Sequence, residues 1–269
     1  MKSKTLILHV GSPKTGTTSI QVFLKENSFA LADAGVNFVK AGRRNIAHNG
    51  MMQSIKTGNA EQVCAEIAEE VATNPAQIHV VSSELFFRQG PANVLATALP
   101  EELRRITKVI CYIRRQDKYL EAMYKQMVKN DRTKPDTMHF RNKRMGSLVY
   151  SKILNAYSNH FGAESLIVRP FERRHFANGD VVDDFMKQIG VPVPENATRP
   201  NQDANKTLSA PVSEMLGMLK RNSQINTREL IREIIRQNAT GAIRSNDVYD
   251  IETRREIMAS LKADNEVVR

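Results

Sequence analysis

The sequence has very little of several residue types on which whole protein classes depend. Only two of its 269 residues are cysteines, Cys64 and Cys111, and they lie far apart in the chain. Two isolated thiols argue against a disulfide framework or a zinc site, so we interpret both as small buried side chains. Tryptophan is absent and aromatic residues make up only 6%. With so few aromatic residues for base stacking, nucleic acid is not an expected partner.

Long apolar runs are also missing. No stretch approaches the roughly 18 consecutive apolar residues that a membrane-spanning helix needs. The N-terminal run Thr5–Val10 is short, leads directly into a glycine-containing turn and has no small-residue cleavage site after it. We therefore interpret it as the first core strand rather than a secretion signal, and we expect a cytoplasmic protein without a transmembrane segment.

Positive charge is the one property present in excess. The chain has 39 Lys and Arg against 29 Asp and Glu, which gives a formal net charge of +10. A basic surface attracts polyanions and speeds the association of anionic ligands. On charge alone the ligand could be a phosphorylated nucleotide, an acidic glycan, an anionic lipid or a nucleic acid.

Short apolar runs alternate with helical periodicities over roughly the first 190 residues. This alternation predicts an α/β fold with three α/β/α layers around a central parallel sheet. The expected strands are Thr5–Val10, Val36–Val39, Ile78–Ser82, Lys108–Ile113 and Leu166–Arg169. The expected helices lie near residues 20–31, 60–72, 116–129, 147–161 and 181–189.

The segment Val191–Asn205 is rich in Pro and Asn and has no periodicity, which indicates a loop. Two helical stripes follow it, one over 208–219 and one over 230–235. The sequence therefore predicts an α/β domain over residues 1–205 and a C-terminal helical extension over residues 206–269, packed on the same domain.

The most informative segment is Gly11–Ser19, with the sequence GSPKTGTTS, between the first strand and the first helix. In this context backbone amides and hydroxyl groups cradle phosphate, and a lysine adds a point charge. A plain Gly/Pro turn with a capping threonine is the simpler alternative. The residues expected to bind the phosphate groups are Pro13, Lys14, Thr15, Gly16, Thr17, Thr18 and Ser19.

This loop differs from that of nucleotide triphosphatases, which have lysine directly after the second glycine. Thr17 occupies that position here, and Lys14 lies earlier in the loop. The late strand ends in Arg114 and Arg115 instead of an aspartate that could hold magnesium. A nucleotide or sugar kinase with an atypical phosphate loop is therefore the second choice.

The stretch Pro13–Thr18 closely resembles the 5′-phosphosulfate loop of sulfotransferases that use 3′-phosphoadenosine 5′-phosphosulfate (PAPS). The resemblance implies a P-loop-like sulfotransferase fold of the bacterial branch, with PAPS as the sulfuryl donor. It also implies that Lys14 lies near the oxygen bridging sulfate and phosphate, where it stabilises the leaving group, and that Thr17 and Thr18 hold the 5′-phosphate. The resemblance extends over about Leu6 to Ser209.

The strand Val109–Ile113 ends in Arg114 and Arg115, and an arginine there can bind a phosphate with its fork of donors. The same family places its 3′-phosphate arginine here, and Arg114 matches it. The family also has a serine eight residues later, and this chain has Ala122 instead. Either another donor replaces the serine or 3′-phosphate recognition is weakened. The candidate replacements are Arg115, Arg199 and Lys206.

Sulfuryl transfer to a hydroxyl group needs a base near the sulfur and, with PAPS as donor, no metal. The family often places this base after the strand that precedes the arginine strand. Glu84 matches that position and is the first candidate, while a helix-capping role is the alternative. His48, in a loop-like segment, is the second candidate, and a core or surface histidine is equally consistent with the pattern.

The expected acceptor is a hydroxyl group of a carbohydrate or glycoconjugate, and an anionic glycan would suit the basic segment Lys125–Met145. A solvated basic face is the simpler interpretation of that segment. A non-catalytic polyanion-binding protein is the alternative from a different functional class. The acceptor, the position sulfated and the oligomeric state are left open, with a homodimer among the alternatives.

Overall fold

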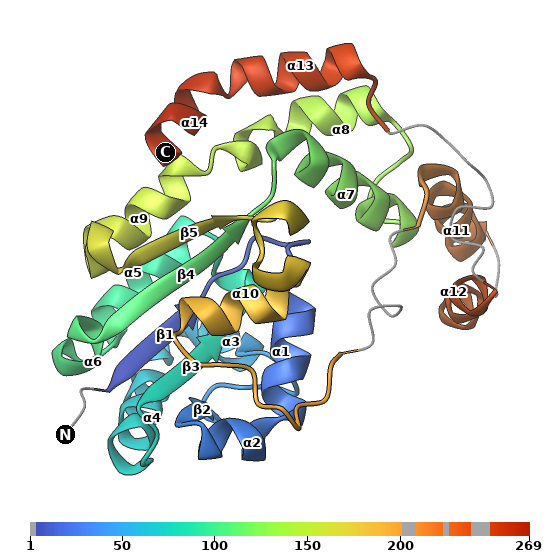
Figure 1. The fold of residues 1–269 in the computed structure, drawn as a ribbon. Coiled ribbons are helices and arrows are strands. Elements are labelled where there is room, and N and C mark those ends of the chain that lie inside the picture. Colours follow the sequence, from blue (N-terminus) through green and yellow to red (C-terminus); the bar gives the residue numbers. More distant parts are fainter. Residues whose placement is uncertain (1–3, 201–207, 223–225, 238–247) are drawn as a thin grey trace. The chain divides into compact units, whose positions relative to one another are not determined.

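The computed structural model describes residues 4–200, 208–222, 226–237 and 248–269 (Figure 1). The chain divides into two compact units. Unit 1 consists of Met1–Arg114 and Ser151–Pro200, and unit 2 consists of Arg115–Tyr150 and Asn201–Arg269. The domain boundary that the sequence suggests between residues 205 and 206 stays a prediction.

Unit 1 is built on a sheet of five parallel strands in the order β2-β3-β1-β4-β5. All five expected strands are present, with ends shifted by at most one residue. They are β1 (Thr5–His9), β2 (Val36–Phe38), β3 (Ile78–Ser82), β4 (Thr107–Ile113) and β5 (Leu166–Pro170). The central strand β1 pairs with β3 on one side and with β4 on the other. Because all strands are parallel, the loops after β1, β3 and β4 leave the same edge of the sheet.

Helices cover both faces of this sheet, so the expected three-layer α/β/α fold is confirmed. The helices α1 (Thr17–Glu26) and α10 (Val181–Gln188) contact each other in front of the sheet in Figure 1, and α5 (Gln89–Ala98) lies behind it. α9 (Ser151–Phe161) packs on β4, β5 and α5. The helices α2 (Ser28–Asp33), α3 (Asn49–Thr57), α4 (Ala60–Thr73) and α6 (Glu101–Arg105) complete unit 1.

The core between the sheet and the pair α1–α10 follows the apolar pattern of the sequence. Ile20, Phe23 and Leu24 recur at helical spacing, and each is fully buried. They pack in one cluster with strand residues such as Ile7 and Val80. This packing fixes α1, whose first turn, beginning at Thr17, forms the end of the segment Gly11–Ser19.

A buried carboxylate anchors α10 to the two strands beside it. Asp184 of α10 is 1% exposed and accepts a hydrogen bond from the Tyr112 hydroxyl at 2.7 Å. Arg169 of β5 adds a bidentate ion pair to the same carboxylate, at 2.7 and 3.1 Å. Burial and the bond to Asp184 raise the pKa of Tyr112 well above its usual range, so the phenol keeps its proton.

In its described part, unit 2 consists of helices and the loops that connect them. Its helices are α7 (Gln116–Lys129), α8 (Thr137–Arg144), α11 (Ala210–Asn222), α12 (Thr227–Arg236), α13 (Ile251–Ser260) and α14 (Lys262–Val268). The two apolar stripes expected after residue 205 form one cluster, in which α12 residues pack against Val212 and Leu216 of α11. Gly217 lets α11 approach α7, because a Cβ there would lie 2.3 Å from the Val128 carbonyl oxygen. No described helix is long and apolar enough to cross a membrane.

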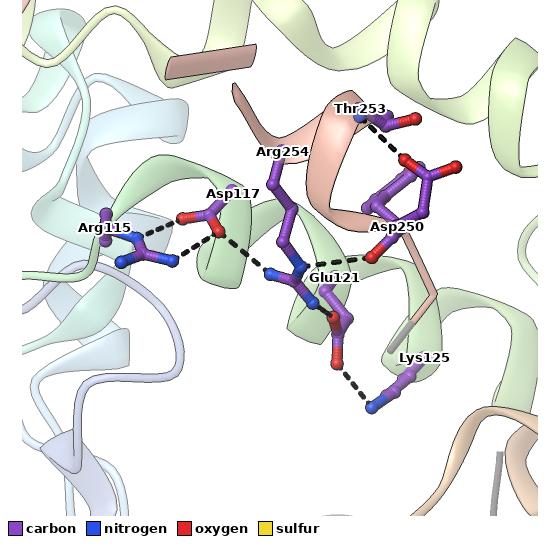
Figure 2. Close-up of polar contacts among 8 residues, drawn as sticks. Arg115, Asp117, Glu121, Lys125, Asp250, Thr253 and Arg254 are labelled. Carbon is purple, nitrogen blue, oxygen red and sulfur yellow. Dashed lines mark hydrogen bonds and ion pairs between the residues drawn. The ribbon is translucent and has the colours of Figure 1, made fainter. Parts of the chain in front are cut away.

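A chain of alternating charges joins α13 to α7 (Figure 2). Arg254 of α13 donates to Asp117 at 2.9 Å and also to Glu121. Asp117 receives two further hydrogen bonds from Arg115, at 2.7 and 2.8 Å, and Glu121 pairs with Lys125 at 2.6 Å. The Asp117 side chain is fully buried, so its charge depends on these partners.

This arrangement predicts an acid-sensitive contribution to the stability of unit 2. Burial opposes ionisation, but hydrogen bonds from Arg115 and Arg254 outweigh it and lower the pKa of Asp117 from 3.8 to about 2. A lowered pKa in the folded state stabilises the fold above the unfolded pKa, and this stability is lost as the pH falls from about 4 through about 2. Urea unfolding at several pH values should therefore show the wild type losing its advantage over Asp117→Asn across that window. An advantage independent of pH would contradict the assignment.

Candidate functional site

The segment between β1 and α1, residues 10–16, forms a tight loop at the carboxyl edge of the sheet. Its first half continues the pairing with β4: the Val10 amide donates to Ile110 at 2.9 Å, and the Ser12 amide donates to Tyr112 at 3.0 Å. The chain then turns and enters α1 at Thr17. Strands β2 and β3 lie on one side of β1, and β4 and β5 lie on the other. The chain therefore adds strands first on one side of β1 and then on the other. In open parallel sheets, ligands bind beyond the carboxyl ends of the strands at such a point.

Two glycines give this loop its shape. A Cβ on Gly11 would lie 2.1 Å from Cγ2 of Thr17, so the chain can pass there only without a side chain. Gly16 adopts a left-handed conformation with φ of 70° directly before α1. Phe171 and Val181 wall the loop at Gly16, where a Cβ would lie 3.0 and 3.1 Å from their side chains. The anchor at Asp184, one turn further along α10, keeps Val181 in this place.

Lys14 has an unusual backbone for its residue type. Its φ is 71°, in the left-handed region that non-glycine residues rarely occupy. Its side chain is exposed, as is that of Thr18 at the start of α1. Strained backbone of this kind clusters at binding and catalytic sites, where it holds a side chain in position.

The remaining hydroxyl groups of the loop divide into two roles. Thr15 is fully buried, and its hydroxyl donates to the Ser12 carbonyl at 2.5 Å, so it braces the loop from within. Thr17 is 3% exposed and directs its hydroxyl across the loop toward β3. Pro13 and Ser19 are half-buried. The expected phosphate-binding residues therefore share one loop, with Lys14 and Thr18 the most accessible of them.

Glu84 lies against this loop. It begins a short 3₁₀ turn, Glu84–Phe86, immediately after β3, and Ser83 caps that turn by accepting the Leu85 amide. The Thr17 hydroxyl donates to Oε2 of Glu84 at 3.3 Å. The Ser83 amide donates to the carbonyl of His9 at 3.1 Å, which ties this turn to β1. The first-choice base is thus brought beside a residue of the phosphate loop.

His48 lies beside Ser82 at the end of β3, and both nitrogens of its ring contact backbone groups. It is completely buried; Nδ1 accepts the Ser82 amide at 3.0 Å and Nε2 lies 3.0 Å from the Val39 carbonyl. Burial lowers the pKa of His48 to about 4. These contacts are those of a core histidine that joins β3 to the end of β2.

The three arginines expected at the cofactor have different surroundings. Arg114 lies at the phosphate loop, where its Nη1 donates to the Lys14 carbonyl at 3.3 Å. Arg115, in unit 2, forms the bidentate pair with Asp117. Arg199 pairs with Asp183 of α10 at 2.5 Å. Ala122, at the position of the expected serine, is buried on α7. Lys206 is one of residues 201–207, which lie outside the described residues.

Sequence reasoning overlooked a buried polar cluster under the loop, formed by His9, Ser82 and Gln21. Nδ1 of His9 lies 2.8 Å from the Ser82 hydroxyl, which also accepts a hydrogen bond from the Gln21 amide at 3.0 Å. A histidine at the end of an apolar strand was the only signal of this cluster. Across the described residues, no group of three or more His, Cys, Asp or Glu side chains is suited to a metal ion.

No protein-family model matches the sequence. An uncharacterised protein of Archaeoglobus fulgidus is 35% identical over 130 residues, which are 48% of this chain and 34% of that protein. The match therefore covers about a third of that relative's length, and the relative itself has no assigned activity.

Two solved structures are similar in part. A sulfotransferase from Alicyclobacillus acidocaldarius aligns with 84% of this chain and 99% of its own, with 17% identity and a TM-score of 0.43. A sulfotransferase domain from the curacin biosynthetic pathway aligns with 86% of this chain and 97% of its own, with 13% identity and a TM-score of 0.38. Likeness at these TM-scores does not assign a function.

Proposed function

We propose that this protein is a sulfotransferase that moves the sulfuryl group of PAPS to an acceptor hydroxyl, with the loop Gly11–Ser19 as the donor site. The observation that carries the proposal is the contact between the Thr17 hydroxyl and Glu84. A loop shaped for an anion usually excludes carboxylates, because they repel the ligand. A carboxylate there has a clear use if it accepts a proton from a hydroxyl that attacks the bound group.

Lys14 is the residue proposed to stabilise the leaving group. Transfer forms a bond between the acceptor oxygen and sulfur and breaks the bond from sulfur to the bridging oxygen, which becomes negatively charged. A fixed ammonium group near that oxygen favours the transition state over the ground state. The exposed side chain and the left-handed backbone of Lys14 support this role. Thr18 and the amides at the start of α1 would hold the 5′-phosphate.

The base is proposed to be Glu84 in preference to His48. The acceptor proton must pass to a group within hydrogen-bond reach of the reacting oxygen. Glu84 is half-buried beside the loop, whereas the ring nitrogens of His48 are both engaged with backbone groups in the core. Arg114, which contacts the loop at Lys14, is the proposed donor for the 3′-phosphate.

A kinase is the second candidate, and the same contact motivates it. A threonine hydroxyl beside a carboxylate is also a pair that can hold Mg²⁺, directly or through water, next to nucleotide phosphates. Against this alternative, the position of the triphosphatase lysine is occupied by Thr17. The two candidates differ in the ligand they require, so a binding experiment separates them.

Thermal unfolding with adenosine 3′,5′-bisphosphate or with ATP and Mg²⁺ tests the proposal. We expect stabilisation by the bisphosphate of about 2.7 kcal/mol at a hundredfold excess over Kd. Lys14→Ala should reduce this stabilisation strongly, because it removes a charge from the site. Lys56→Ala, which removes an exposed lysine on α3, is the matched control and should keep it.

Each outcome selects one function. Selective stabilisation by the bisphosphate, lost in Lys14→Ala, supports the sulfotransferase. Stabilisation only by ATP with Mg²⁺ would replace it with the kinase. If neither ligand stabilises the protein, the loop is not a nucleotide site, and binding of a polyanion becomes the better explanation of the positive charge.

A further inference from the structure

His9 lies directly beneath the phosphate loop, where the proposed function gives it no role. It is the last residue of β1 and is completely buried. Its ring packs against Tyr112 and Phe185, with centroids 6.0 and 5.1 Å away. Nδ1 lies 2.8 Å from the hydroxyl oxygen of Ser82 on the neighbouring strand β3. The ring therefore joins the two strands from which the loop and Glu84 emerge.

The hydrogen-bond network assigns the ring proton of His9. Burial lowers its pKa to about 3, so the ring is neutral near pH 7 and carries one proton. The Ser82 oxygen already accepts a hydrogen bond from Gln21 at 3.0 Å. Ser82 is fully buried, and because the Gln21 amide is a donor, Nδ1 of His9 is the acceptor available to the Ser82 hydroxyl proton among the described residues. Nδ1 is then the acceptor, and Nε2 carries the proton.

The Nε2 atom is buried and has no hydrogen-bond partner among the described residues. Buried donors without acceptors are rare in folded proteins, and each one calls for an explanation. Nε2 lies 3.3 Å from the point that a Cβ on Gly11 would occupy, and Oγ1 of Thr15 lies 3.3 Å from the same point. The unpaired N–H is therefore at the underside of the phosphate loop, next to its first glycine.

We propose that His9 is a positioning residue of the phosphate loop: when an anion occupies the loop, Nε2–H donates to a loop oxygen between Gly11 and Thr17. This bond would tie the occupied loop to Ser82, two residues before Glu84, and so fix the distance between the bound group and the base. The inference rests on the proposed function only in requiring an anion on this loop. The left-handed backbone of Lys14, in the same loop, is a conformation that costs free energy and that a bound ligand could help to compensate.

Two substitutions of His9 distinguish the contribution of Nδ1 from that of Nε2. In His9→Asn the side-chain amide can still reach Ser82 in place of Nδ1, but nothing replaces Nε2. In His9→Gln the longer amide can place an N–H near the position of Nε2, while the bond to Ser82 is lost. If His9 positions the loop, His9→Asn should bind adenosine 3′,5′-bisphosphate about 5- to 100-fold more weakly, the range for one lost buried hydrogen bond. His9→Gln should stay within a few-fold of the wild type.

The stability of the unliganded protein is the control for a merely structural role. Loss of the Ser82 bond predicts that His9→Gln is the less stable variant, so affinity and stability should rank the two variants in opposite orders. In ¹⁵N-histidine NMR spectra, the Nε2–H signal should shift downfield and exchange more slowly when the bisphosphate is added. Equal affinities in the two variants, or an Nε2–H signal unchanged by a bound ligand, would overturn the proposal.

Failure of the inference about His9 can be distinguished from failure of the proposed sulfotransferase function. If the protein binds ATP with Mg²⁺ instead of the bisphosphate, the sulfotransferase proposal fails, and the same two variants test His9 with ATP as the probe. If neither ligand binds the wild type, the loop holds no nucleotide anion, and the inference about His9 is overturned with it.

Discussion

Glu84→Gln is expected to lower kcat for sulfuryl transfer by about 10²- to 10⁴-fold, the range for removal of a general base. The substituted side chain keeps its size and can still accept the hydrogen bond from Thr17, but it cannot take a proton from the acceptor hydroxyl. The measurement is transfer of ³⁵S-sulfate from PAPS to the best acceptor in a panel of unsulfated glycans and phenols.

Although Glu84→Gln should lower kcat, it should increase the affinity for adenosine 3′,5′-bisphosphate. Because Glu84 places a negative charge 3.3 Å from a hydroxyl of the phosphate loop, its removal should tighten binding of adenosine 3′,5′-bisphosphate. Glu61→Gln removes an exposed carboxylate from α4 and should leave both quantities unchanged. Retention of full transfer by Glu84→Gln would remove the residue from the mechanism. Weaker binding of ATP with Mg²⁺ would instead identify Glu84 as a metal ligand of a kinase.

Arg254→Met is expected to lower the free energy of unfolding by about 3 kcal/mol, the lower end of the range for breaking a buried ion pair. Arg254 is 8% exposed and contacts both Asp117 and Glu121, so its loss leaves two carboxylates of α7 with one cation each. Methionine fills much of the arginine volume, which keeps the change mainly electrostatic. The measurement is urea unfolding monitored by circular dichroism.

The neighbouring residue provides the control. Arg255 is exposed, and Arg255→Met should change stability by no more than about 0.5 kcal/mol, as for most surface substitutions. The double variant Arg254→Met/Asp117→Asn should recover part of the loss, because the buried charge is removed together with its partner. If Arg254→Met is no less stable than Arg255→Met, the network in Figure 2 contributes little to stability.

The sheet could be predicted because parallel strands buried on both faces are continuous apolar runs, and all five were found within one residue. Helices were harder where the apolar stripe is weak or interrupted. Residues 49–57 and 89–98 form α3 and α5 without having been expected. The predicted helix over 147–161 begins only at Ser151, after a 3₁₀ turn over Met145–Leu148. Tertiary packing, rather than local pattern, decides such segments.

Residues of the candidate site could be named from the sequence where they are contiguous, but not where they depend on contacts between distant segments. The segment Gly11–Ser19 is contiguous, so its residues could be named from the sequence, whereas Glu84 was named from the resemblance to the sulfotransferase family, which often has its base after the corresponding strand. The ion pair of Arg199 with Asp183, the burial of His48 and the cluster at His9 depend on contacts between distant segments. No single-sequence pattern contains those contacts. The polar end of β1 was the one visible sign of the cluster.

The bond from Arg254 to Asp117 joins residues 137 positions apart, and this separation has a consequence for biosynthesis. While the chain emerges from the ribosome, α7 presents Asp117 and Glu121 well before their shared cation exists. Until residue 254 has been made, these carboxylates have only Arg115 and Lys125 as partners in the network. Unit 2 therefore completes its charge pairing late in synthesis, and a nascent chain arrested before residue 250 should leave α7 more susceptible to proteolysis than one released after residue 260.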